Sequence, residues 1–138
     1  MQYLLLWICI VAGLYGEESF VVIGSREFPA THLTQQQVKQ IYLKRMRFVQ
    51  GVPLLPINYP ALDPLRNRFE GMMLHMSHKQ LKRYWAKEHY LGQRPPLVQA
   101  SVESAVAFVR EVKGAIAYIP ASQLPEGVRV LYREGERP

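Results

Sequence analysis

Short apolar runs alternate with amphipathic helical segments along this chain, and that order limits the folds open to it. The run SFVVIG at 19–24 is β-branched, uninterrupted and closed by a glycine, which is typical of a buried strand. In the next segment, THLTQQQVKQIYLKR at 31–45, Thr34 and Gln37 have the spacing of a capping box. The apolar residues of that segment fall on one helical face. A strand followed by an amphipathic helix favours an α/β domain.

Three further helices are predicted from the same kinds of signal. Asp63 is a good N-cap and Pro64 suits the first helical position. Ser77 and Gln80 form a second capping box, and Ser101 is the N-cap of the last helix. Each segment has an apolar stripe at helical spacing: Leu65, Phe69, Met72, Met73 and Met76; then Leu81, Tyr84, Trp85 and His89; then Ala105, Val106, Phe108, Val109 and Val112.

The remaining runs predict the other strands. GVPLLPINY at 51–59 is interrupted by Pro53 and Pro56, which favours an edge strand or an extended segment. A short extended LVQA, the strands AIAYIP and VRVLYR, and a C-terminal tail EGERP complete the chain. The predicted order, β-α-β-α-α-(β)-α-β-β, indicates an α/β domain with a mixed sheet flanked by helices. The residues expected to be largely buried are Phe69, Tyr84, Trp85, Phe108, Val109, Ile116 and Tyr118.

The first sixteen residues, MQYLLLWICIVAGLYG, form an uncharged apolar segment that gives way to Glu17 and Glu18. This segment is too short to span a membrane comfortably and is typical of a signal peptide. An uncleaved anchor and a buried first element are the alternatives. The chain has 138 residues and no internal repeat. We therefore expect a signal peptide at 1–16, one domain at 17–133, a flexible tail at 134–138, and export to a bacterial periplasm.

Cysteine content and charge narrow the class of protein further. Cys9 is the only cysteine and lies in the N-terminal segment, so the mature domain has no disulfide scaffold. The formal net charge is +6, which raises nucleic acid, anionic lipid or an acidic protein as partners. The basic residues are spread along several helices, and no familiar nucleic-acid-binding motif is present. We expect no nucleic-acid partner, and membrane contact only through an uncleaved N-terminal segment.

No residue pattern indicates an enzyme, a metal centre or a cofactor. The mature chain lacks a cysteine nucleophile, a Gly-x-Ser-x-Gly elbow and a glycine-rich phosphate loop. His75 and His78 straddle a helix start without a third ligand nearby in the sequence. The acids lie on different helices with basic neighbours, as in Arg66 and Glu70, which is typical of surface ion pairs.

Two long stretches resemble the substrate-binding proteins of phosphate transporters. The first stretch, at residues 33–69, is LTQQQVKQIYLKRMRFVQGVPLLPINYPALDPLRNRF. It is similar to a family stretch that begins Leu-Ser-x-x-Gln-Leu-x-x-Ile-Phe, continues through Trp-x-x-Gly and the anion loop, and ends at Arg-x-x-Phe. The second stretch, at residues 81–120, is LKRYWAKEHYLGQRPPLVQASVESAVAFVREVKGAIAYIP. It is similar to the family's Tyr-Trp and its Val-x-x-x-x-Gly-Ala-Ile-Gly-Tyr. The resemblance covers about residues 20–131 and implies one periplasmic-binding-protein-like lobe, where the family's usual member has two.

The anion loop is where the chain departs from this family. The family loop reads Arg-x-Asp-x-Ser-Gly-Thr; the matching positions here are occupied by Tyr59, Ala61, Asp63, Pro64 and Leu65. Proline has no N–H to donate, and a carboxylate stands where phosphate oxygens would lie. The degenerate cleft that the resemblance implies would include Ser25, Tyr59, Asp63, Leu65 and Arg66.

The sequence therefore predicts an exported, non-catalytic binding module with a protein partner in the cell envelope. The alternative is a periplasmic solute-binding protein whose specificity has changed, with a cationic or apolar small molecule held through Asp63 and Tyr59.

Overall fold

The computed structural model describes residues 18–136. Its elements, in chain order, are β1 (Phe20–Ser25), α1 (Gln35–Tyr42), β2 (Phe48–Val49), β3 (Val52–Pro53), β4 (Leu55–Asn58), α2 (Pro64–Phe69), a π-helical turn (Glu70–Leu74), α3 (His78–Tyr90), β5 (Leu97–Val98), α4 (Val102–Glu111), β6 (Ala115–Pro120), a 3-10 turn (Ala121–Gln123) and β7 (Val128–Arg133).

Five strands form one mixed sheet in the order β5-β4-β6-β1-β7. β4 runs parallel to both β5 and β6, whereas β1 runs antiparallel to β6 and β7. All six residues of β1 are buried, as expected for a β-branched run with a strand on each side. The predicted mixed α/β sheet flanked by helices is confirmed.

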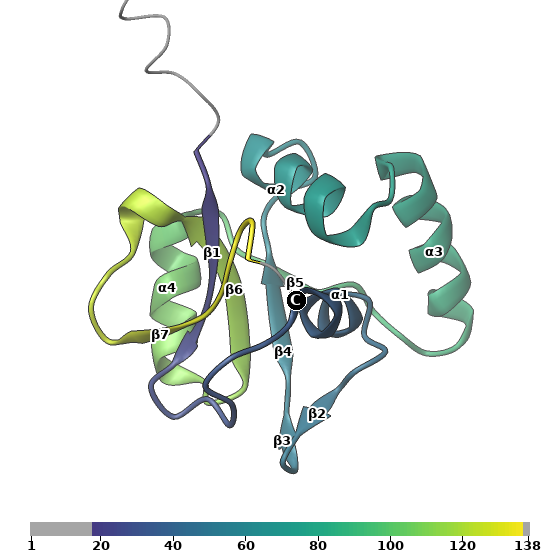
Figure 1. Ribbon diagram of the computed structural model, residues 1–138. Helices are drawn as coiled ribbons and strands as arrows, with labels where there is room; N and C mark the ends of the chain where they lie inside the picture. Colours follow the sequence, from purple (N-terminus) through teal and green to yellow (C-terminus); the bar gives the residue numbers. More distant parts are fainter. Residues whose placement is uncertain (1–17, 137–138) are drawn as a thin grey trace, which may run out of the picture.

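Helices cover the sheet on two sides, with α4 on one side and α1 and α2 on the other (Figure 1). The core beneath α1 and α2 is aromatic. The ring of Tyr118 from β6 stacks on that of Phe69 from α2, with centroids 3.8 Å apart, and Tyr42 from α1 meets Phe69 edge-on. Phe20 of β1 completes this cluster. The predicted burial of Phe69, Val109, Ile116 and Tyr118 is confirmed.

The helix starts predicted from capping residues are confirmed for α1, α3 and α4. The hydroxyls of Thr34 and Ser77 each accept a hydrogen bond from the backbone N–H of the third helical residue. The side chains of those third residues, Gln37 and Gln80, accept a hydrogen bond from the backbone N–H of the capping residue. Ser101 is the N-cap of α4, as expected. Each cap satisfies N–H groups that the helix itself leaves unpaired.

The strand β4 corrects one prediction, because it lies inside the sheet and not at its edge. The Leu55 N–H donates to the Gly114 carbonyl beside β6, so the nitrogen of Pro56 faces the opposite side. On that side β5 pairs only with Ile57 and Asn58. An inner strand therefore tolerates Pro56, because no partner is present where its N–H is missing.

A glycine is required at position 114, because the backbone at Pro53 passes very close to it. A Cβ atom at this position would lie 1.9 Å from the carbonyl oxygen of Pro53. No side chain fits there without a shift of the β3–β4 backbone. Gly114 therefore lets two backbone segments meet.

The predicted apolar stripe after Pro64 is only partly confirmed. Phe69 and Met73 are buried, but Met72 is 43% exposed. The helix continues as a π-helical turn at Glu70–Leu74, which has more residues per turn than an α-helix. The extra residue rotates Met72 away from the core and brings Leu74 toward it.

Helix α3 also departs from the prediction. Leu81 is its only buried residue, and Tyr84 and Trp85 are only partly covered. Figure 1 shows α3 set apart from the sheet. The expectation that Tyr84, Trp85 and Phe108 are largely buried is only partly confirmed. All three are partly exposed, and Tyr84 and Phe108 pack against the rim of the core.

A hairpin between residues 48 and 53 was not predicted. β2 pairs antiparallel with β3, and the two residues between them, Gln50 and Gly51, both have positive φ. This is the backbone of a type I′ turn, for which Gln-Gly is a weaker signal than Asn-Gly.

The C-terminal residues up to Glu136 contact the domain. The backbone N–H of Glu134 donates to the Phe20 carbonyl, and the Glu134 carboxylate pairs with Arg68 at 2.6 Å. Glu136 lies 2.5 Å from His32. The expected signal peptide with Cys9 lies outside the described residues. Within the described part of the chain, no helix has the length and apolarity to cross a membrane.

Candidate functional site

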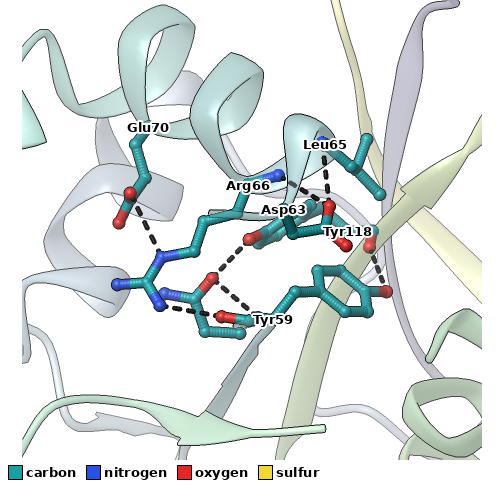
Figure 2. A network of polar contacts seen from close by, with 7 residues as sticks. Tyr59, Asp63, Leu65, Arg66, Glu70 and Tyr118 are labelled. Carbon is teal, nitrogen blue, oxygen red and sulfur yellow. Dashed lines mark hydrogen bonds and ion pairs between the residues drawn. The ribbon is translucent and has the colours of Figure 1, made fainter. Parts of the chain in front are cut away.

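The candidate site lies at the carboxyl ends of β4, β5 and β6, the edge at which open α/β sheets bind ligands. The turn after β4 leads through Asp63 into α2, so the predicted strand–turn–helix junction is present. Tyr59, Asp63, Leu65 and Arg66 all belong to it (Figure 2).

The first turn of α2 is capped from within the chain. Asp63 Oδ1 accepts hydrogen bonds from the backbone N–H groups of Leu65, at 2.9 Å, and Arg66, at 3.3 Å. Pro64, between Asp63 and Leu65, has no N–H. The two N–H groups at the start of this helix are therefore already paired with a carboxylate.

The guanidinium of Arg66 also has partners inside the protein. Its Nη1 donates to the backbone carbonyl of Tyr59 at 2.7 Å, and its Nε donates to Glu70 at 3.2 Å (Figure 2). The side chains of Arg66 and Glu70 are 16% and 7% exposed. The prediction of a surface ion pair is wrong, because the π-helical turn and the core cover Glu70.

Tyr59 is a core residue. It is 1% exposed, and its hydroxyl donates to the Tyr118 carbonyl at 2.8 Å. Burial, and then the nearby Asp63 carboxylate, raise the pKa of Tyr59 above its usual value. A ligand at the surface does not reach this side chain, so the expected contact between Tyr59 and a ligand is not supported.

Two buried residues that the sequence analysis did not assign to the site, Asn58 and Tyr118, complete the network. Asn58 Oδ1 accepts from the backbone N–H of Tyr59 at 2.9 Å and from the hydroxyl of Tyr118. Burial is the main cause that raises the pKa of Tyr118 well above its usual value. The sequence signal was a polar residue at the end of an apolar run, namely Asn58 after Pro-Ile.

Ser25 does not join the other predicted site residues. It follows Gly24, which pairs with Ile116 near the start of β6, and its hydroxyl donates to the Lys113 carbonyl at 3.4 Å. Tyr59 lies four residues beyond Leu55, the β4 residue level with that end, or about 13 Å along the sheet. Ser25 therefore belongs to the opposite end of the sheet.

A pocket of about 270 Å³ opens beside the first turn of α2. Among the predicted site residues, Leu65 lines it. The other lining residues are Glu18, Pro64, Arg68 and Pro120. Arg68 is held by Glu134, and Glu18 accepts from the Ser122 N–H at 2.9 Å. The pocket is thus mainly apolar, with its charged groups already paired.

The two histidines singled out in the sequence lie at the surface. His75 has a left-handed backbone with φ of +53°, and His78 is in the first turn of α3; both are exposed. Between residues 18 and 136, no three His, Cys, Asp or Glu side chains are grouped so that they could hold a metal ion.

The mixed sheet, its helices and a candidate site at the carboxyl strand ends define one lobe of the periplasmic-binding-protein type. No family model and no curated protein matches the sequence. The fold is matched by solved structures, although sequence identity to them is low.

Three of these structures are phosphate-transport proteins. An ABC-type phosphate transport receptor from Vibrio cholerae has a TM-score of 0.66 and 16% identity over 83% of this chain. A putative phosphate ABC transporter substrate-binding protein from Clostridium perfringens, solved with bound phosphate, has a TM-score of 0.67, 15% identity and the same coverage. PstS from Borrelia burgdorferi has a TM-score of 0.65 and 13% identity over 88% of this chain. This chain spans 44–49% of their lengths.

Proposed function

We propose that this chain is an exported, non-catalytic solute-binding lobe whose specificity has moved away from phosphate. The fold shared with three phosphate-transport proteins supports the solute-binding part. It favours the interpretation that the sequence placed second, ahead of a protein-interaction module. The pairing of the α2 N-terminus with Asp63 is the observation that carries the change of ligand.

Phosphate would have to displace groups that are already well paired. Its oxygens would compete with Asp63 for the N–H groups of Leu65 and Arg66, and with Glu70 for the Arg66 guanidinium. Each hydrogen bond to a charged group contributes about 1.5–3 kcal/mol, and the displaced carboxylates would remain close to a second anion. The first turn of α2 is therefore proposed to be a structural cap and not an anion site.

The pocket beside Leu65 suits an uncharged, apolar solute. It adjoins the carboxyl end of β6 at Pro120, and its charged groups are held by Glu134 and by Ser122. An apolar molecule in this pocket would be stabilised by about 25 cal/mol for each Å² of apolar surface removed from water.

Calorimetry tests the proposed loss of phosphate binding. Inorganic phosphate is titrated into the Lys44→Gln/Arg47→Gln variant, which removes two cations, the half-buried Lys44 and the exposed Arg47, from a separate pocket that α2 does not line. We expect no saturable heat. A phosphate dissociation constant in the micromolar range or below would overturn the proposal.

A thermal-shift screen tests the apolar ligand class, with apolar, cationic and anionic compounds in parallel. Apolar compounds should raise the melting temperature of the wild type and lose their effect in Leu65→Asp. Hits that stabilise both proteins equally would place the binding elsewhere and contradict the proposal.

A protein partner in the cell envelope is the second candidate function. Leu62, in the loop between β4 and α2, is 86% exposed, and Val98 on the edge strand β5 is 55% exposed. Exposed apolar side chains beside an open strand edge are typical of surfaces that pair with another chain. Crosslinking in an envelope fraction should give a specific product that Leu62→Asp abolishes; an unchanged product would exclude this surface.

A further inference from the structure

A second pocket lies at the opposite end of β4 from the candidate site. Its volume is about 170 Å³, and it is enclosed by the end of α1, the β2–β3 hairpin and the loop after α3. Pro53, on its wall, is six residues from Tyr59, or about 20 Å along an extended strand. Figure 1 shows the hairpin and α2 at opposite ends of β4.

Two cations line this pocket without a compensating acid. Lys44 and Arg47 are among its lining residues, and none of the lining residues is acidic. Within residues 18–136, neither cation belongs to an ion pair. Burial, and then the charge of Arg47, lower the pKa of Lys44. The site thus places two like charges together, an arrangement that an anion between them would relieve.

The backbone holds these cations in a fixed turn. Lys44 has φ of +57°, a left-handed conformation that is uncommon for a residue other than glycine. The N–H of Lys44 donates to the Ile41 carbonyl at 3.0 Å, and those of Arg45 and Met46 donate to the Gln40 carbonyl at 2.9 and 3.1 Å. These bonds fix the turn before any ligand arrives, which lowers the entropic cost of binding.

The rest of the pocket is apolar. Ile41 and Leu54 are buried in its wall, and Phe48, which also lines it, is 57% exposed. Gln93, from the loop after α3, adds an amide that can donate or accept. Because sites for drug-sized ligands enclose about 300–1,000 Å³, this pocket suits a smaller molecule.

We propose that this pocket binds a small phosphate monoester, with the phosphoryl group between Lys44 and Arg47 and an apolar or aromatic body against Phe48. A phosphate monoester carries about −1.5 to −2 charges at neutral pH, which matches two cations better than a carboxylate does. This site is independent of the pocket beside Leu65, and either can fail without the other.

Calorimetric titration with phenyl phosphate tests the site. The wild type should show saturable binding at one site, and Lys44→Gln/Arg47→Gln should weaken it by about tenfold or more, since two charge-assisted contacts are lost. Lys82→Gln/Arg83→Gln removes the same charge from the exposed face of α3 and should leave the affinity unchanged. No saturable binding, or an equal loss in both variants, would overturn the proposal.

Two further measurements locate the ligand and test its chemistry. Phenyl phosphate should shift the backbone amide resonances of Lys44, Arg47 and Gln93, and should raise the pKa of Lys44 toward its usual value. Benzoate should bind more weakly and benzyl alcohol should not bind. Equal binding of benzoate, or resonance shifts confined to α2, would contradict the assignment of a phosphate monoester to this pocket.

Discussion

At the residue scale, a single carboxylate fills the place where a helix N-terminus could meet an anion. Asp63 caps two N–H groups of α2 and lies close enough to Tyr59 to raise the pKa of its phenol. Arg66 is similarly engaged by Glu70 and by a backbone carbonyl. These side chains stabilise the junction between β4 and α2, and each is open to a direct test.

Replacing Asp63 by alanine should lower the free energy of unfolding by about 0.5–2 kcal/mol, because two N–H groups lose their acceptor. Chemical denaturation measures the change. Asp63→Asn is the matched control and should cost much less, since asparagine is an equally good N-cap. Equal losses in both variants would show that the negative charge, and not the cap, is what matters.

Alkaline pH should destabilise the protein through its buried tyrosines. The folded-state pKa values of Tyr42, Tyr59 and Tyr118 are raised, mainly by burial. The stability that these groups contribute is complete below the unfolded pKa near 10 and is lost as the pH rises above it. Each tyrosine should lower the free energy of unfolding by about 1.4 kcal/mol per pH unit there.

Denaturation above about pH 11, where the unfolded tyrosines are almost fully ionised, measures that slope. Tyr59→Phe removes one titrating group and should make the slope shallower by about 1.4 kcal/mol per pH unit. A slope identical to that of the wild type would contradict the link between Tyr59 and alkaline unfolding.

At the element scale, similar amphipathic patterns led to different packing. Phe69 of α2 lies in the aromatic core, 3.8 Å from the ring of Tyr118 between centroids. Trp85 of α3 has its ring 4.9 Å from Tyr84 and remains partly exposed. The apolar stripe of α3 therefore covers less of the core than that of α2, despite the greater length of α3.

Alanine substitutions should reveal this difference. Phe69→Ala should cost about 3–5 kcal/mol of unfolding free energy, as expected for a buried aromatic residue. Trp85→Ala should cost less than half of that, because its ring is not enclosed. Chemical denaturation of both variants measures the two losses of unfolding free energy. A larger loss for Trp85→Ala than for Phe69→Ala would contradict the observed placement of α3.

At the scale of the whole molecule, the five-stranded sheet joins segments from both ends of the described chain. β1 lies between β6 and β7, so the strand that follows the N-terminal segment is paired on both edges by C-terminal strands. The Glu134 carboxylate adds a contact to the backbone N–H of Phe20 at 3.1 Å. Folding therefore requires contacts between residues more than 100 positions apart, which is the slow class of contact to form.

Export should depend on residues 1–16, because this apolar run is the one targeting signal that the sequence contains. A reporter that is active only outside the cytoplasm should work when fused after the full chain and fail when residues 1–16 are removed. A cytoplasmic reporter on the same two fusions shows whether both proteins accumulate. Equal extracytoplasmic activity without the segment would remove the proposed localisation.

Features that depend on residues close together in the chain could be predicted from the sequence. Thr34, Asp63, Ser77 and Ser101 mark helix starts because an N-cap bonds to N–H groups two or three residues away. The β-branched run at 20–23 identified β1 as a strand, because β-branched side chains favour an extended backbone. The sequence also showed that Asp63 and Pro64 differ from the anion loop of the phosphate-binding family that this chain resembles.

The surroundings of each element follow from how distant segments pack together, and they differ from the predictions at several positions. That packing placed β4 inside the sheet, buried the Arg66–Glu70 pair, turned Met72 outward and moved Ser25 to the far end of the sheet. It also brought Gln93 to the pocket of Lys44 and Arg47. Burial, ion pairing and pocket formation depend on distant segments that meet in space, and periodicity within one segment carries no information about which partner will cover it.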